Sequence, residues 1–245
     1  MKKALFGLAV AAAALTGCRN AEVVTSPDVR TFGMAGDVKA VSYTLEQIIP
    51  SEEPGAGPEY DTLFVNEPVL AFDAQGRVTL DGYDNVYEYD AEGNFVRGFN
   101  DKTVMQRDAQ GRIVLYDNTI SLDDESDAEI DYENYVKLEI SYDAQGRPDM
   151  VDQEGWESMC QTKFVYEGDN AYPFRELYDL LYEGWEDDGA VEYEYTAFDE
   201  KGNWTERFYT STIKTTASWD EEYEPEITEI RYRERRTITY WSDKH

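Results

Sequence analysis

The segment Tyr142-Asp143-Ala144-Gln145-Gly146-Arg147-Pro148 is the clearest copy of a short motif that decides the expected fold. Asp is followed by Gly three residues later in five copies, which contain the pairs Asp73 and Gly76, Asp90 and Gly93, Asp108 and Gly111, Asp143 and Gly146, and Asp199 and Gly202. A degenerate copy covers residues 166–170. Asp at the first position of a type I turn accepts hydrogen bonds from the following amides, and Gly readily adopts the left-handed conformation that ends such a turn. We therefore predict a β-hairpin with a G1 bulge at each copy.

The spacing of these turns predicts an antiparallel β-meander. Asp73, Asp90 and Asp108 follow one another at intervals of 17 and 18 residues, and Asp143 follows after 35. One such interval holds two strands of about six residues and two tight turns. We therefore expect an all-β fold, with residues 38–245 forming one domain. Its roughly dozen strands should form a strongly twisted or curled open sheet, either barrel-like or two-layered.

Residues 173–183 allow two interpretations. Apolar residues in this segment have helical spacing between a Pro and a Gly that could begin and end a helix. The register of the repeats instead makes residues 167–170 a turn, and the chain that returns from it should pair as a strand. We favour the strand.

The segment Gly82-Tyr83-Asp84-Asn85-Val86-Tyr87-Glu88-Tyr89-Asp90-Ala91-Glu92-Gly93-Asn94-Phe95 resembles the YD repeat of Rhs-type proteins. It contains Gly, four residues, Tyr-x-Tyr-Asp, two residues and a second Gly. The segments 36–41 and 202–204 also resemble bacterial lipoproteins that carry such repeats. In long Rhs proteins the repeats form a hollow β shell around a toxin, but six loose copies are too few to enclose such a cargo. The resemblance spans about residues 38–208 and implies no catalytic residues.

The N-terminus has the features of an export signal. Met1-Lys2-Lys3 is cationic, and the apolar run that follows, residues 4–15, is too short to be a permanent membrane span. Leu15-Thr16-Gly17-Cys18 then resembles the lipobox of bacterial lipoproteins. The resemblance implies that residues 1–17 are removed and that Cys18 carries the lipid that attaches the protein to a membrane. We expect residues 18–37 to be the lipidated Cys and a spacer. Arg19 lacks the Asp that retains some lipoproteins in the inner membrane, so the resemblance favours the outer membrane of the bacterial envelope.

Composition excludes several functional classes. The chain has 52 Asp and Glu against 22 Lys and Arg, and its formal charge of −30 would repel nucleic acid. His245 is the single His, which excludes imidazole catalysis and multi-histidine metal centres. With Cys18 lipidated, Cys160 has no partner for a disulfide, and we expect it to be an inert thiol on the apolar face of a strand.

An acidic segment, residues 123–134, partly matches a calcium loop, with Asp123, Glu125 and Asp127 as weak candidate ligands. It has Ala128 where the loop requires Gly and Asn134 where a bidentate Glu is expected. We therefore expect a solvated loop and no cofactor, and keep weak Ca²⁺ binding as the alternative.

Two further groups have both a structural and a functional interpretation. Arg231, Arg233 and Arg235 alternate along one predicted strand and could bind an anion, but we expect them to pair with acidic neighbours such as Glu192 and Glu194. The five Trp and nineteen Tyr could form sugar-binding platforms, although aromatic residues are also common in strands. We expect most of them to pack across strands.

These features leave three functional hypotheses. The first is a lipid-anchored, non-enzymatic binding or scaffold module with an unknown protein or glycan partner. The second is a carbohydrate-binding or glycoside-hydrolysing lipoprotein, which an exposed Trp beside two carboxylates about 5–10 Å apart would favour and buried Trp would oppose. The third is a component of an Rhs-like surface assembly, which an unpaired edge strand would favour. The sequence has no Ser nucleophile elbow, Cys-His pair, phosphate-binding Gly loop or metal-ligand cluster, and no pair of carboxylates stands out for glycoside hydrolysis. These absences weaken the case for an enzyme and leave it open.

Overall fold

A computed structural model describes residues 25–51, 56–80, 86–98, 103–118, 136–155, 157–217 and 223–243. These residues form one short helix and fourteen strands. The elements are α1 (Pro27–Thr31), β1 (Val38–Ile49), β2 (Glu59–Phe72), β3 (Val78–Leu80), β4 (Glu88–Tyr89), β5 (Phe95–Arg97), β6 (Val104–Arg107), β7 (Ile113–Asp117), β8 (Val136–Tyr142), β9 (Pro148–Gly155), β10 (Ser158–Val165), β11 (Arg175–Tyr182), β12 (Trp185–Phe198), β13 (Trp204–Ala217) and β14 (Glu226–Tyr240).

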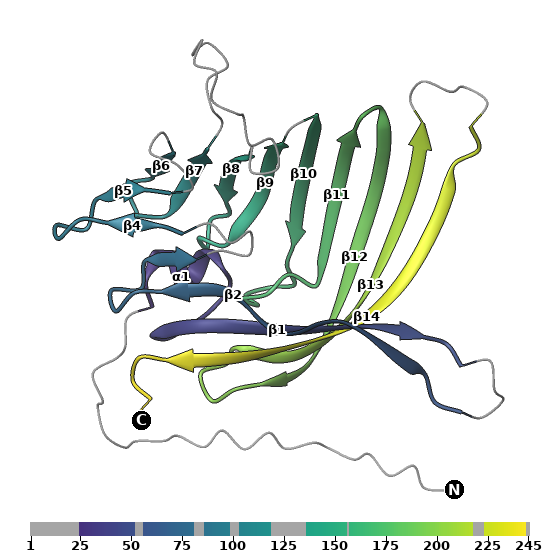
Figure 1. The fold of residues 1–245 in the computed structure, drawn as a ribbon, viewed down its shortest axis with the longest axis horizontal. Coiled ribbons are helices and arrows are strands. Elements are labelled where there is room, and N and C mark those ends of the chain that lie inside the picture. The colour runs from purple at the N-terminus through teal and green to yellow at the C-terminus, as the bar shows by residue number, and fades with distance from the viewer. Residues whose placement is uncertain are drawn as a thin grey trace, which may run out of the picture.

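Twelve of the strands form one antiparallel sheet (Figure 1). Its order is β3-β2-β1-β14-β13-β12-β11-β10-β9-β8-β7-β6, and β4 pairs with β5 in a separate hairpin. Consecutive strands are neighbours from β6 to β14, and β14 then pairs with β1 through a long antiparallel register. The all-β, antiparallel prediction is confirmed. The strand interpretation of residues 173–183 is also confirmed, because β11 occupies most of that segment.

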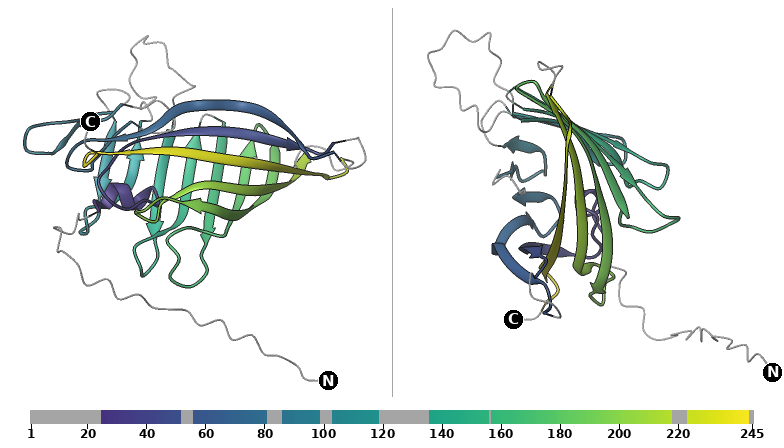
Figure 2. Two further views of the ribbon diagram at one scale, coloured as in Figure 1. Left: turned by 90° about the horizontal axis from the view of Figure 1, so that it is seen from below. Right: turned by 90° about the vertical axis from the view of Figure 1, so that its right-hand side faces the viewer.

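The sheet is strongly curled but is not closed into a barrel (Figure 2). Its two edges are β3 and β6, which α1 connects through the carboxylate of Asp28. That carboxylate accepts a hydrogen bond from the Val78 amide of β3 at 2.9 Å and forms an ion pair with Arg107 of β6. Asp28 is only 2% exposed. Side-chain contacts from α1 therefore join two edges that are not joined by a backbone ladder.

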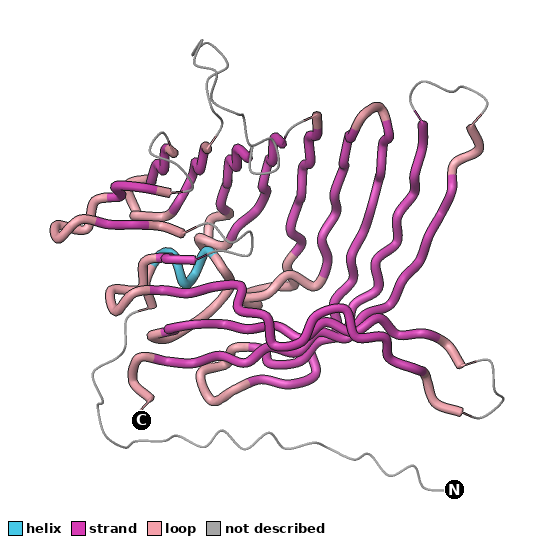
Figure 3. The backbone as a smooth tube through the Cα atoms, in the orientation of Figure 1, coloured by secondary structure: helices cyan, strands magenta, loops and turns pink. Residues whose placement is uncertain are grey.

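The five Asp-Gly corners are tight turns between antiparallel strands, drawn as loops in Figure 3. At Asp143, Oδ1 accepts from the amides of Gln145 and Arg147 at 2.9 Å, and the Gly146 amide donates to the Asp143 carbonyl at 3.0 Å. The five glycines have φ between 76° and 90°, the left-handed region in which a side chain would be strained.

Each Arg at the end of a turn also contacts a Tyr beside the next turn along the chain. Arg112 pairs with Asp108 in its own turn, and its guanidinium lies 4.2 Å from the centre of the Tyr142 ring. The Tyr142 hydroxyl in turn donates to the carbonyl of Ile113 at 2.6 Å. Arg147 and Tyr166 repeat the arrangement at 4.0 Å. The motif therefore links neighbouring turns as well as reversing the chain.

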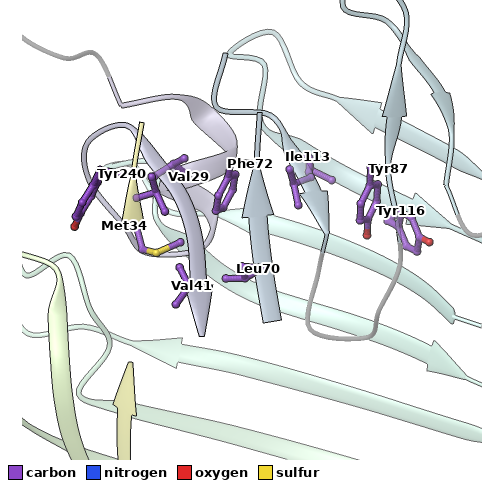
Figure 4. Close-up of a cluster of buried hydrophobic side chains, with 11 residues drawn as sticks. Val29, Met34, Val41, Leu70, Phe72, Tyr87, Ile113, Tyr116 and Tyr240 are labelled. Atoms are coloured by element: carbon purple, nitrogen blue, oxygen red, sulfur yellow. The ribbon is translucent and has the colours of Figure 1, made fainter. Parts of the chain in front are cut away.

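The hydrophobic core lies where α1 meets β1, β2, β7 and β14 (Figure 4). Val29 is 1% exposed and Met34 is 4% exposed, and both belong to the segment expected to be a spacer. Residues 27–37 are therefore part of the folded domain, and the predicted boundary at residue 38 is too late. The apolar residues in this segment are few, but the Ser26 hydroxyl caps α1 and directs Val29 into the core.

Candidate functional site

A pocket of about 200 Å³ lies between the end of α1, the turn that joins β10 to β11, and one face of the sheet. We call this face the inner face; it carries Tyr195, Arg207 and Glu234, which are register neighbours on β12, β13 and β14. Aromatic side chains make up much of the wall, and they are Phe32, Tyr43, Phe164, Tyr166, Tyr172, Tyr195 and Trp204.

Arg207 is held by a carboxylate at the back of the pocket. Its guanidinium donates to Oε2 of Glu234 at 2.7 Å and lies 4.2 Å from the ring centre of Tyr193. Burial alone would lower the pKa of Arg207, but the negative charge of Glu234 outweighs it and the pKa is raised. Arg207 is therefore a permanently paired cation.

Arg236 differs from Arg207, because it is buried without a carboxylate. It is 5% exposed, its Nε donates to the carbonyl of Trp204, and its guanidinium lies 3.9 Å from the centre of the Trp204 ring. Within the described ranges, Arg236 forms no ion pair and its Nη2 has no hydrogen-bond partner. The pocket wall thus contains a guanidinium that forms no ion pair with any described carboxylate.

The remaining polar groups of the pocket are neutral donors or a perturbed acid. Burial raises the pKa of the Glu176 carboxyl, and the charge of Arg207 only partly opposes this shift. Burial also raises the pKa of Tyr43, which Arg236 partly offsets, and raises the pKa of Tyr195 to about 12. The hydroxyls are therefore protonated at neutral pH. The pocket can offer a guanidinium, flat aromatic surfaces and one carboxyl group to a ligand.

Several predicted residues lie away from the pocket or outside the described residues. Cys18, Asp123, Glu125 and Asp127 fall outside the described residues. Cys160 is a half-buried free thiol, 3.8 Å from the Thr162 hydroxyl. In the part of the chain that the structure describes, no group of three or more His, Cys, Asp or Glu could hold a metal ion.

The arginine stripe pairs across strands on the opposite, outer face, as predicted. Arg231 lies 3.9 Å from Glu194, Arg233 lies 2.5 Å from Glu206, and Arg235 lies 3.1 Å from Glu46. The other predicted partner, Glu192, is instead 3.7 Å from Arg175.

Sequence reasoning missed the distinct position of Arg236. It follows Arg235 directly, and successive side chains of a strand point to opposite faces. The alternation that grouped the other three arginines could therefore have separated Arg236 from them.

The described tryptophans have mixed environments. Trp204 is 3% exposed and packs within the pocket wall, as expected for core packing. Trp185 and Trp241 are 36% and 44% exposed, and they contact Tyr223 and Lys39 respectively.

Comparisons with known proteins do not assign the chain to a family. No family model matches the sequence, and no curated protein is significantly similar to it. Within the described ranges, none of the helices has the length and apolar character needed to cross a membrane.

Proposed function

We propose that this protein is an exported, lipid-anchored binding protein of the bacterial envelope, attached through Cys18 to the outer membrane. The lipobox-like Leu15–Cys18 segment supports the anchor, and the Asp-Gly turns support a relationship to lipoproteins with YD-like repeats. The observation that carries the binding function is the aromatic pocket beneath α1. Its size and its convergent polar groups suit a small, ring-shaped ligand such as a carbohydrate unit.

Two features favour binding over glycoside hydrolysis. Glycosidases use two carboxyl groups that face the same bond, whereas Glu176 is the only acidic residue among those described in the pocket wall. Trp204, the Trp of the pocket, is almost fully buried, so it offers little open surface to a sugar chain. The pocket therefore supports capture of a ligand better than cleavage.

The edges of the sheet do not favour an Rhs-like assembly. The edge strands β3 and β6 have three and four residues. Asp28 bridges both of them to α1. Short edges covered in this way are poor templates for pairing with another chain.

The anchor is tested with the full chain in a bacterium that has two membranes. We expect Cys18→Ser to abolish incorporation of a labelled fatty acid and to release the protein from the membrane fraction. The matched variant Cys160→Ser should remain labelled and membrane-bound. Equal labelling of both variants would disprove lipidation at Cys18.

Ligand binding is tested with the chain from residue 19 onward, which contains every described residue. Calorimetry with a panel of mono- and disaccharides should detect a ligand, and Tyr172→Ala should weaken its binding at least tenfold. Tyr182, which is 47% exposed on β11 and is not part of the pocket wall, provides the control variant Tyr182→Ala. If no saccharide binds, or if both variants behave alike, the pocket is not the binding site.

A further inference from the structure

Among the described residues, the buried guanidinium of Arg236 has one backbone acceptor, and its Nη2 has no hydrogen-bond partner. That acceptor is the Trp204 carbonyl, and the Trp204 ring covers one side of the guanidinium. The nearest candidate counter-ion along β14 is Glu234, but its carboxylate is paired with Arg207. Arg236 therefore remains a cation with unused donors at the wall of a cavity.

A buried charge is normally paired, because its transfer out of water is costly unless an opposite charge and hydrogen bonds compensate for it. The chain has a formal charge of −30, so carboxylates are abundant in the sequence. Within the described residues, however, none is placed against Arg236, while Arg231, Arg233 and Arg235 next to it all have one. A carboxylate supplied from outside the chain would complete this site.

We propose that the pocket binds a small organic carboxylate, whose carboxylate group pairs with Arg236 and whose ring packs against Tyr172 and Tyr195. This inference rests on the proposed function and narrows it to one class of ligand. The cavity is large enough, because an engineered cavity of about 150 Å³ holds benzene and this pocket measures about 200 Å³. The planar guanidinium matches a carboxylate with two parallel hydrogen bonds.

The neighbouring tyrosines are suited to the same ligand. Tyr43 and Tyr172 both line the pocket, and the positive charge of Arg236 partly opposes the burial that raises the pKa of each hydroxyl. Burial raises the pKa of both hydroxyls, so neither becomes an anion that would compete with the ligand's carboxylate for the guanidinium. The Tyr172 hydroxyl already donates to the Gly202 carbonyl at 3.0 Å, so Tyr172 offers its ring to the ligand. Glu176, whose pKa burial raises, opposes an anion less than an ordinary glutamate would.

Two sources could supply a ring that bears a carboxylate, namely a sugar acid and an aromatic acid. The experiment therefore compares glucuronate with glucose, and benzoate with benzyl alcohol, by calorimetry on the chain from residue 19. Inorganic phosphate serves as a fifth probe for anion binding without a ring. We expect the acid of one pair to bind at least tenfold more tightly than its neutral partner, and phosphate to bind more weakly than that acid.

The role of Arg236 is tested with Arg236→Gln and with the matched outer-face variant Arg233→Gln, which removes the same charge. We expect Arg236→Gln to abolish the preference for the acid and Arg233→Gln to leave it within twofold. Near-ultraviolet circular dichroism of the Trp and Tyr side chains checks that each variant folds. If Arg236→Gln does not fold, Arg236→Lys, which keeps the charge but loses the paired geometry, should lower the affinity at least fivefold.

The outcomes separate this inference from the proposed function. If an acid and its neutral partner bind equally, or if Arg236→Gln retains the preference, the carboxylate assignment is wrong although the pocket still binds a ligand. If none of the five probes binds, the carboxylate assignment is also overturned, and the saccharide panel with Tyr172→Ala then decides the binding function separately.

Discussion

Replacing Asp28 with Ala should destabilise the protein more than other carboxylate substitutions in the chain. This carboxylate holds together the two edges of the sheet, because it accepts from the Val78 amide on one edge and pairs with Arg107 on the other. Its side chain is 3% exposed, so water cannot replace either partner without local opening of the structure.

The magnitude follows from these contacts. Hydrogen bonds to a charged group contribute about 1.5–3 kcal/mol, and a buried N–H left without a partner costs about 1–3 kcal/mol. Arg107 is 28% exposed, so water will compensate for part of its loss. We therefore expect Asp28→Ala to lower the free energy of unfolding by about 3–5 kcal/mol, the range measured when one partner of a buried ion pair is removed. In a chain of this size the melting temperature should fall by about 6–20 °C.

The assay is urea unfolding of the chain from residue 19, followed by tryptophan fluorescence, together with thermal unfolding. Asp37→Ala is the control, since Asp37 pairs with Lys201 at a more exposed position and should contribute no more than about 1 kcal/mol. A double-mutant cycle of Asp28→Ala with Arg107→Met should give a coupling energy above about 1 kcal/mol. If Asp28→Ala costs no more than the control, or if the coupling energy is near zero, Asp28 does not hold the two edges together.

Three other predictions concern the turns and the buried tyrosines. Gly146→Ala should lower the free energy of unfolding in urea by about 1–2 kcal/mol, because φ is 82° there. The control Gly57→Ala has open space around it and no positive φ, so it should leave the free energy of unfolding unchanged. Equal effects of the two substitutions would show that the left-handed turn position does not matter. Arg112→Gln should lower the free energy of unfolding by about 1–2 kcal/mol, because it removes both an ion pair and a contact with a Tyr ring, and an unchanged urea midpoint would contradict this. Burial raises the pKa of Tyr89 and Tyr195 to about 12, so unfolded chains lose these protons near pH 10 and folded chains do not. The free energy of unfolding should therefore be unchanged below pH 10 and fall between pH 10 and 12. Phenolate absorbance of the folded protein should show hydroxyls that titrate near pH 12, and titration of all of them near pH 10 would contradict the prediction.

The turns were predictable because their causes are local. An Asp carboxylate, a Gly in the left-handed region and alternating flanking residues specify a hairpin within about ten residues of chain. The strand assignment of residues 173–183 depended on the same repeat. The pairing of Arg231, Arg233 and Arg235 with acidic neighbours followed from strand alternation together with the high acidic content.

The features that sequence reasoning missed depend on contacts between distant segments. Pairing of β1 with β14 joins residues almost two hundred positions apart, and nothing near either strand specifies that partner. The helix α1 has five residues, which is too few for a periodic signal, and its Asp28 acquires two partners only when β3 and β6 approach. The isolation of Arg236 likewise depends on which carboxylates the folded sheet places elsewhere.

The repeated turns also explain why the pocket lies at this end of the sheet. Its wall includes Tyr166, which begins a turn, and Pro148 and Trp204, each of which directly follows one. The Tyr166 hydroxyl donates to the Pro148 carbonyl at 2.8 Å while Arg147 covers its ring, so the wall is fixed by the contacts that join successive turns. Binding sites gain affinity when their groups are held in place before the ligand arrives. The pocket wall therefore includes residues that contacts between successive turns hold in place. By the same reasoning, loosening a turn such as the one at Gly146 should weaken ligand binding as well as stability, whereas the Gly57 substitution should affect neither.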